Sequence, residues 1–295
     1  MALPDFDLKL PTTLTEALAL AGQGAPGVVL MAGGTDVMLQ LKQGVLAPAT
    51  VVSLARVREI VGIREGDGSI SIGGGTTVSS LAASELLRDR LPGIVDAARS
   101  MATTQIRQRA TVAGNLATAA ACADLSPILH ALGARLWLQT ATGQREVPLS
   151  AFFRGPRVTV LAPGEILVSV EISPDGPTTG SAYVKFGYRR GAQIAVASAG
   201  ARVTLEDGAV SEISVVLGAV APTPLPVEGA RLLVGKRPEG APLAAVCEAA
   251  ARECRPISDL RGSAAYRRAV VAVVTRQAIV AALARACGKR QEVRA

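Results

Sequence analysis

Residues 109–129 of the chain read RATVAGNLATAAACADLSPIL, and their side chains are unusually small. Alanine, threonine and glycine fill most positions up to Asp124, where a buried segment would normally carry larger apolar residues. Glycine tolerates a positive φ angle and lets a ligand approach the main chain closely. We therefore expect this stretch to bind a ligand close to its backbone.

Three glycine-containing turns share this bare character: MAGGTD at 31–36, IGGGTT at 72–77 and TVAGN at 111–115. Successive N–H groups in such turns can form a concave nest that binds an anion, such as a pyrophosphate, without a lysine. None of the turns fits GxGxxG or GxxxxGK[ST], so neither a Rossmann dinucleotide turn nor a P-loop is supported. Each could also be an ordinary strand-to-helix connection, and the residues alone leave both possibilities open.

Bulk composition narrows the class of protein. The 295 residues are 49% hydrophobic but only 3% aromatic, so cores must be built from Ala, Val, Leu and Ile. A net charge of +7 would suit a nucleic acid, an anionic membrane surface or an acidic protein partner. So few aromatic residues disfavour base stacking, and we expect no nucleic-acid partner. Arg189, Arg190, Arg267 and Arg268 are expected to meet solvent or an acidic partner surface.

The cysteines and the chain start bear on the compartment. Cys122, Cys247, Cys254 and Cys287 show no CxxC and no paired spacing, which predicts neither a metal site nor a disulfide framework in this chain. The start, MALPDFDLKL, does not resemble a signal peptide. No uncharged apolar run is long enough to span a bilayer. The sequence thus predicts a cytoplasmic protein of a reducing compartment with no membrane span.

Hydrophobic periodicity predicts an α+β fold in three parts. Residues 1–55 alternate helix and strand as a small α/β unit, and residues 56–175 add further strands and helices. The clearest linker is SPDGPTTG at 173–180, with two prolines and two glycines. Residues 181–287 read as antiparallel strands followed by two long helices, which is an α+β domain.

Six pieces of the sequence occur together in one known family: AGGTDVM, ISIGGGTTVSSL, QIRQRATVAGNLATAAACADLSPIL, GEILVSVEI, KFGYRRGAQIAVA and RGSAAYRRAVV. In their order and spacing, over residues 1 to about 285, the chain resembles the FAD-binding medium subunit of the molybdenum hydroxylases. This is the family of xanthine dehydrogenase and aerobic carbon monoxide dehydrogenase. The resemblance implies a two-subdomain FAD-binding fold of the vanillyl-alcohol-oxidase/PCMH type, with the C-terminal domain closing over the flavin.

The resemblance also implies roles for residues. The first glycine turn would wrap the FAD pyrophosphate, with Gly33, Gly34 and Thr35 closest, while Thr111 and Gly114 would complete the nest. Asn115 would brace it, and Asp124 would accept hydroxyl hydrogen bonds at the adenosine end. Met101 and Ala102 would line the flavin, Ile166 or Leu167 would pack on the adenine side, and Lys185 would reach across from the C-terminal domain. The complete implied set is Leu30, Met31, Ala32, Gly33, Gly34, Thr35, Asp36, Val37, Met101, Ala102, Thr111, Gly114, Asn115, Asp124, Ile166, Leu167 and Lys185.

The chain departs from the family pattern at a few positions. Val112 and Ala113 replace the usual Ile-Gly pair, and alanine resists positive φ, which leaves the backbone geometry at residue 113 open. Gln193 replaces an aspartate that could orient the C-terminal domain.

A flavin carries its own redox chemistry, so no catalytic residue and no metal ligand is predicted in this chain. His130, the only histidine, lies in the helical pattern ILHALGA and is expected to be a packed residue, so the FAD should be non-covalent. Cys122 is expected to be a small packing residue rather than a thiol facing the flavin.

In the family, a large subunit hydroxylates the substrate at a molybdenum cofactor, and a small subunit passes the electrons through two [2Fe-2S] clusters to the FAD. The resemblance thus implies the electron-transfer subunit of a heteromeric oxidoreductase, a dimer of heterotrimers (a heterohexamer), with the molybdenum cofactor and both clusters in partner subunits. Two alternatives stay open: a self-sufficient FAD-dependent oxidase or reductase, and a non-enzymatic nucleotide-binding module. The substrate and the final electron acceptor are not predicted.

Overall fold

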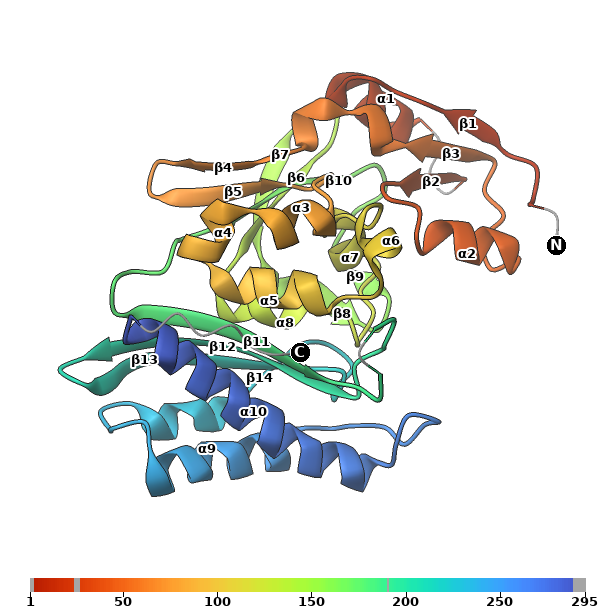
Figure 1. The fold of residues 1–295 in the computed structure, drawn as a ribbon. Helices are drawn as coiled ribbons and strands as arrows, with labels where there is room; N and C mark the ends of the chain where they lie inside the picture. Colours follow the sequence, from red (N-terminus) through yellow and green to blue (C-terminus); the bar gives the residue numbers. More distant parts are fainter. Residues whose placement is uncertain (1–2, 24–26, 190, 289–295) are drawn as a thin grey trace.

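The computed structural model describes residues 3–23, 27–189 and 191–288. Its N-terminal part begins with a three-stranded parallel sheet in the order β1-β3-β2 (Figure 1). The elements are β1 (Asp7–Lys9), α1 (Leu14–Gly22), β2 (Val28–Met31), α2 (Val37–Lys42) and β3 (Thr50–Ser53), followed by 3₁₀ turns at Leu54–Arg56 and Arg58–Ile60. The predicted α/β unit at the start of the chain is therefore present.

A second, antiparallel sheet has the order β4-β5-β10-β6-β7. Its strands are β4 (Ile63–Gly66), β5 (Ser69–Gly73), β6 (Arg135–Gln139), β7 (Gln144–Pro148) and β10 (Ile166–Ile172). Short helices lie between this sheet and the C-terminal domain (Figure 1): α3 (Val78–Ala83), α4 (Glu85–Arg90), α5 (Pro92–Ser100), α6 (Thr104–Arg107), α7 (Val112–Ala117) and α8 (Leu125–Ala131). A 3₁₀ turn (Leu149–Ala151) leads into a small hairpin, β8 (Phe153–Gly155) and β9 (Val158–Thr159).

The C-terminal domain is an antiparallel sheet, β11 (Thr179–Phe186), β12 (Ala197–Glu206), β13 (Ala209–Gly218) and β14 (Leu225–Pro226), with a 3₁₀ segment at Glu228–Leu233. Two helices, α9 (Gly240–Glu253) and α10 (Ala264–Ala286), cover one face, while α5 and α8 of the N-terminal part pack on the other (Figure 1). The predicted α+β class is confirmed. The boundaries 1–55, 56–175 and 181–287 stay predictions.

Side-chain caps explain where many helices begin. A hydroxyl oxygen at the residue before the helix accepts a backbone N–H of the first turn, which would otherwise have no partner. The capping residues are Thr13, Thr77, Ser84, Thr103, Thr111 and Ser263. Thr13 precedes α1 and accepts the N–H of Glu16 at 3.2 Å.

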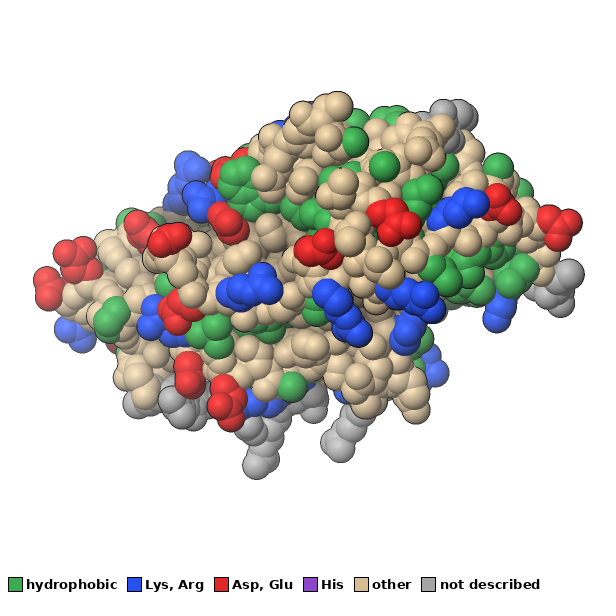
Figure 2. All heavy atoms as spheres, turned by 90° about the horizontal axis from the view of Figure 1, so that it is seen from above, with side chains coloured by type: hydrophobic (Ala, Val, Ile, Leu, Met, Phe, Trp, Pro, Cys, Tyr) green, Lys and Arg blue, Asp and Glu red, His purple; other side chains and the backbone are tan. Residues whose placement is uncertain are grey.

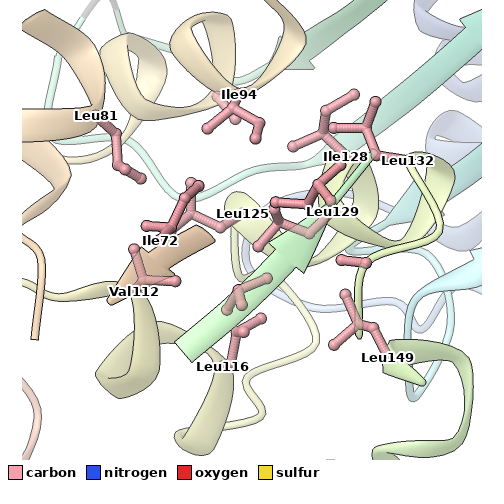
Figure 3. Close-up of a cluster of buried hydrophobic side chains, with 14 of the residues drawn as sticks. Ile72, Leu81, Ile94, Val112, Leu116, Leu125, Ile128, Leu129, Leu132 and Leu149 are labelled. Carbon is pink, nitrogen blue, oxygen red and sulfur yellow. The ribbon is translucent and has the colours of Figure 1, made fainter. Parts of the chain in front are cut away.

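The central core orients residues 109–129. Val112 and Leu116, one turn apart on α7, point into a cluster with Ile72 of β5 and Leu125 of α8 (Figure 3). All four side chains are fully buried. Residues 113–115 are half-buried, and Ala113 still packs partly against this cluster. The same short helix thus packs on one side and offers its backbone on the other.

The surface charge and helix α10 concern two partner classes that the sequence disfavours, nucleic acids and membranes. On the face seen from above, Lys and Arg side chains are interspersed with Asp and Glu, so the net charge forms no continuous basic field there (Figure 2). Among the described residues, α10 is the one helix long and apolar enough to cross a membrane, with a mean hydropathy of 1.6. It packs on β11, β12 and α9, as a core helix of the domain does.

Arg267 was expected at solvent or on a partner surface, and the structure corrects this. Its side chain is buried, with one guanidinium nitrogen donating to the carbonyl oxygens of Val196 (3.1 Å) and Ala219 (3.0 Å). The other nitrogen donates to Asp259 at 2.6 Å. Arg268 is exposed as predicted, whereas Arg190 lies outside the described residues.

Replacing Arg267 by methionine is expected to lower the free energy of unfolding by about 2 to 3 kcal/mol, since two buried carbonyls and Asp259 lose a charged donor. Chemical denaturation of the variant measures this. Arg268→Met is the matched control, and it should change stability by no more than about 0.5 kcal/mol because its side chain is exposed. Equal losses in the two variants would contradict the structural role of Arg267.

Candidate cofactor site

Two of the three glycine turns meet back to back. A methyl group at Gly33, in the turn between β2 and α2, would lie 1.9 Å from the carbonyl oxygen of Arg109. A methyl group at Gly114 would lie 4.0 Å from the Cβ atom of Ala32. The absence of side chains at both positions therefore lets segments from two subdomains form one backbone surface.

The first turn presents hydrogen-bond donors on this surface. Within the described ranges, the backbone N–H groups of Gly33, Gly34 and Thr35 have no acceptor. Gly34 has a φ of +75°, a conformation that favours glycine. Neighbouring free N–H groups of this kind suit a phosphate or another anion.

The turn at 72–77 does not form a nest, which corrects the hypothesis that all three turns bind an anion. The N–H groups of Gly73, Gly74 and Gly75 donate to carbonyl oxygens of residues 62, 168 and 60 at 2.8–2.9 Å. Methyl groups at Gly73 and Gly74 would lie 2.3 and 2.2 Å from backbone oxygens. These glycines are therefore required for close backbone packing.

The turn at 72–77 supports the turn at 111–115. The carbonyl oxygens of Thr76 and Gly74 accept the N–H groups of Val112 (3.0 Å) and Ala113 (2.9 Å). Ala113 lies inside α7 and has no positive φ, so the replacement of glycine by alanine creates no strain there. The N–H of Gly114 donates to Thr111 Oγ1 at 3.1 Å, which leaves it less available to a ligand than the donors of the first turn.

Asn115 has an unsatisfied acceptor. Its Oδ1 atom is buried and has no hydrogen-bond partner among the described residues, while its Nδ2 atom lies 4.0 Å from Met101 Sδ. A buried amide oxygen without a donor costs about 1 to 3 kcal/mol. A bound group that donates a hydrogen bond would remove this penalty. Asn115 and Met101, 14 residues apart in the chain, are thus brought together beside the glycine turns.

Backbone strain is concentrated around the same region. Ala102 (φ +45°) and Ala192 (φ +51°) are joined by a bond from Ala192 N–H to the carbonyl of Ala102 at 3.2 Å. Arg157 (φ +61°) donates its N–H to the carbonyl of Ala119 (φ +46°) at 2.8 Å. Positive φ at a residue other than glycine costs on the order of 1 to 3 kcal/mol and persists mostly at functional sites.

One more strained residue joins this group. Ala219 (φ +65°) donates its N–H to the carbonyl of Ala121 at 2.8 Å. The remaining described residues of this type, Asp67 and Asp207, precede glycines in hairpin turns, where the conformation is expected. Arg157 also lies in a hairpin turn, between β8 and β9, so the strained residues outside hairpins are Ala102, Ala119, Ala192 and Ala219.

Asp124 and Lys185 form a buried pair between the domains. Lys185 Nζ lies 3.0 Å from the Asp124 carboxylate and donates to the carbonyl of Ser100 at 3.1 Å, and its side chain is 1% exposed. Tyr183 donates its hydroxyl to Asp124 Oδ1 at 2.9 Å. Lys185 thus reaches across from the C-terminal domain, but Asp124 already has two protein partners. The predicted role of Asp124 as an acceptor for cofactor hydroxyls would require it to share these oxygens.

Burial dominates the electrostatics of this pair. It raises the pKa of Asp124, and the Lys185 charge and the two hydrogen bonds counter this only in part. Burial also raises the pKa of Tyr183 well above its ordinary value, with the Asp124 charge contributing, so the phenol stays a hydrogen-bond donor.

Ile166 and Leu167 are separated by the sheet. Ile166 (2% exposed) packs in the cluster formed with the first subdomain, and Leu167 (3% exposed) packs in the central core. They belong to β10, where the register shifts between Leu167 and Ser169. Contact of either with an adenine stays a prediction.

Arg157 was missed by the sequence analysis. It lies on the β8–β9 hairpin, and its guanidinium is 3.3 Å from the carboxylate of Asp36, at the end of the first glycine turn. The Asp36 carboxylate also accepts a hydrogen bond from Gln40 Nε2. These two acidic and basic residues are 121 positions apart, so no local pattern could have paired them.

A cavity of about 1410 Å³ adjoins the site between α5, β11 and α10. Of the predicted site residues, only Lys185 lines this cavity. Ser100 and Gln193 line it as well. No residue of the glycine turns lines it. The described residues contain no group of three His, Cys, Asp or Glu side chains that could hold a metal ion.

Neither candidate for a reaction with the flavin is exposed. Cys122 is half-buried, and burial together with the Asp124 charge raises the pKa of its thiol. His130 is half-buried in the last turn of α8, and burial lowers its pKa.

The glycine surface, its free donors and the interdomain pair agree with comparisons to known proteins. Residues 4–174 match the model of the FAD-binding domain in molybdopterin dehydrogenase, and residues 182–282 match that of the CO dehydrogenase flavoprotein C-terminal domain. The chain belongs to this family of FAD-binding oxidoreductase subunits. The predicted two-part architecture, an FAD-binding domain followed by a C-terminal domain with an antiparallel sheet, is confirmed.

Relatives are similar over nearly their whole length. The carbon monoxide dehydrogenase medium chain of Hydrogenophaga pseudoflava is 33% identical over 285 residues, covering 96% of this chain and 98% of the relative. The xanthine dehydrogenase FAD-binding subunit of Escherichia coli O157:H7 is 32% identical over 282 residues, covering 95% and 96%. The solved carbon monoxide dehydrogenase of Hydrogenophaga pseudoflava has a chain with a TM-score of 0.93 and 32% identity, covering 97% and 99%.

Proposed function

We propose that this chain is the FAD-carrying electron-transfer subunit of a heteromeric molybdenum hydroxylase. It would accept electrons from [2Fe-2S] clusters of a partner subunit and pass them to an external acceptor. The single observation that carries the proposal is the shared backbone surface of the two glycine turns, with free N–H groups at Gly33, Gly34 and Thr35. Membership of the FAD-binding family supports it.

The residues present fit the cofactor. The free N–H groups of the first turn would hold the pyrophosphate, and the unsatisfied Asn115 Oδ1 would accept a hydrogen bond from the bound molecule. Met101 and Ala102 would line the flavin, held in place by two contacts from the C-terminal domain: Lys185 on the carbonyl of Ser100, and Ala192 on the carbonyl of Ala102. When bound, FAD supplies the redox chemistry, so the chain itself needs no acid, base or nucleophile.

The partners and compartment belong to the proposal. We infer a small iron-sulfur subunit and a large molybdenum-binding subunit, arranged as a dimer of heterotrimers, with non-covalent FAD in this chain. Four free cysteines support a reducing, cytoplasmic compartment. The named relatives, a carbon monoxide dehydrogenase and a xanthine dehydrogenase, differ in substrate. The residue that selects the substrate is therefore proposed to lie in a partner subunit.

The visible absorption spectrum of the purified chain, and of the supernatant after acid precipitation, tests the proposal. We expect flavin bands that pass into the supernatant as FAD. A colourless chain that also fails to take up added FAD would favour the nucleotide-binding module instead. Substrate turnover by the isolated chain, without partner subunits, would favour the self-sufficient oxidase or reductase.

A further inference from the structure

The first glycine turn contains a carboxylate where an anion is expected to bind. Asp36 follows Gly33, Gly34 and Thr35 directly, and their N–H groups are the free donors of the site. A negative charge this close repels a phosphate, and the repulsion falls off only slowly with distance at a partly buried surface. The turn can therefore bind a pyrophosphate well only if the charge of Asp36 is neutralised.

Arg157 supplies that positive charge. Among the ion pairs of the described residues, it is the one cation paired with the turn at 31–36, at 3.3 Å from Asp36 Oδ2. Gln40 also donates to Asp36 but carries no charge. The Arg157 side chain is 59% exposed, so a bound phosphate could reach the guanidinium without a change in the fold.

The backbone shows that Arg157 is held in place. Its φ of +61° is a strained conformation for arginine, and its N–H donates to Ala119, which is strained in the same way. An exposed ion pair contributes little to folding, so the pair with Asp36 does not account for this strain. Arg157 follows Pro156 in the two-residue turn between β8 and β9, so the hairpin fixes its backbone independently of the ion pair with Asp36.

We propose that Arg157 is a positioning residue for the pyrophosphate of the cofactor. It neutralises Asp36 at the rim of the glycine turn, so the turn binds the dianionic group more tightly when the charge of Asp36 is paired. Guanidinium groups bind phosphate oxygens with charge-assisted hydrogen bonds. The inference rests on the proposed function, because it assumes that FAD binds at this turn.

The test uses the full-length chain freed of FAD, with binding of FAD and of ADP measured by calorimetry. Arg157→Gln is expected to weaken FAD binding at least 10-fold. ADP, which carries the pyrophosphate without the flavin, should lose affinity by the same factor. Adding Asp36→Asn to Arg157→Gln should restore most of the affinity, because the repelling charge is removed. Arg154→Gln, an exposed arginine on the same hairpin, is the matched control and should bind FAD as the unaltered chain does.

Other binding results would contradict either the role of Arg157 or the proposed function. An Arg157→Gln variant that binds FAD with unaltered affinity would overturn the inference. A weakened variant that Asp36→Asn fails to restore would also overturn it, since Arg157 would then not act by relieving the repulsion between Asp36 and the phosphate. Thermal unfolding of each variant separates a loss of fold from a loss of binding. Failure of the unaltered chain to bind FAD would contradict the proposed function itself.

Discussion

Gly33→Ala is expected to weaken FAD binding by this chain strongly and to lower its stability. The new methyl group would lie 1.9 Å from the carbonyl oxygen of Arg109, a backbone atom that cannot move alone. The two turns must then separate, and overpacking of this kind typically costs about 1 to 3 kcal/mol. Separation also displaces the free N–H groups, so we expect the affinity for FAD to fall by a factor of about 100 or more, as small misplacements of binding groups do.

Flavin absorbance after gel filtration and chemical denaturation measure the two effects. Gly22→Ala is the matched control, because no atom lies within 4 Å of the added methyl group at the end of α1. This control should keep its FAD and its stability. A Gly33→Ala variant that retains stoichiometric FAD would show that the two turns do not form the binding surface.

Lys185→Met is expected to lower the free energy of unfolding by about 3 to 5 kcal/mol near neutral pH. The substitution leaves the carboxylate of Asp124 buried without its cation, and removing one partner of a buried pair has an effect of this size. The carbonyl of Ser100 loses its donor as well. We expect the domains to separate first in this variant, since Lys185 links the C-terminal domain to the segment that carries Met101 and Ala102.

The loss should depend on pH in a defined direction. Burial already raises the folded-state pKa of Asp124 above its ordinary value of 3.8, and removal of Lys185 raises it further. The native state then binds a proton that the unfolded state has lost, so stability falls as the pH rises above about 4. Lys185→Met should therefore be closest to the unaltered chain at acid pH. Denaturation curves recorded at about half-unit intervals between roughly pH 4.5 and 8 would show this slope.

A double variant provides the control. Asp124→Asn combined with Lys185→Met removes both charges, so it should recover part of the lost stability near neutral pH and lose the pH dependence. If the double variant is as unstable as Lys185→Met at neutral pH, the loss comes from packing around the lysine stem rather than from an unpaired carboxylate.

The sequence by itself determined the features that depend on neighbouring residues. Hydrophobic periodicity and turn residues predicted the small α/β unit at residues 1–55, the linker after β10 and the antiparallel sheet with two long helices. The cap at Thr13 is local in the same way, because the N–H that it accepts belongs to Glu16, three residues away. Bare backbone at Gly33–Gly34 and at 111–115 marked two segments of the site, since small side chains at a turn are a local signal.

Only the tertiary structure decided how those segments are used. The turn at 72–77 looks like the other two in sequence, but its N–H groups are bonded to distant carbonyls and it supports the second turn. Arg267 and Arg268 are adjacent, and the helix turns one into the core and the other to solvent. Arg157 meets Asp36, and Lys185 meets Asp124, across separations that no pattern of a few residues can express. Such contacts depend on the packing of whole subdomains, which is why the charges that govern the site emerged only in three dimensions.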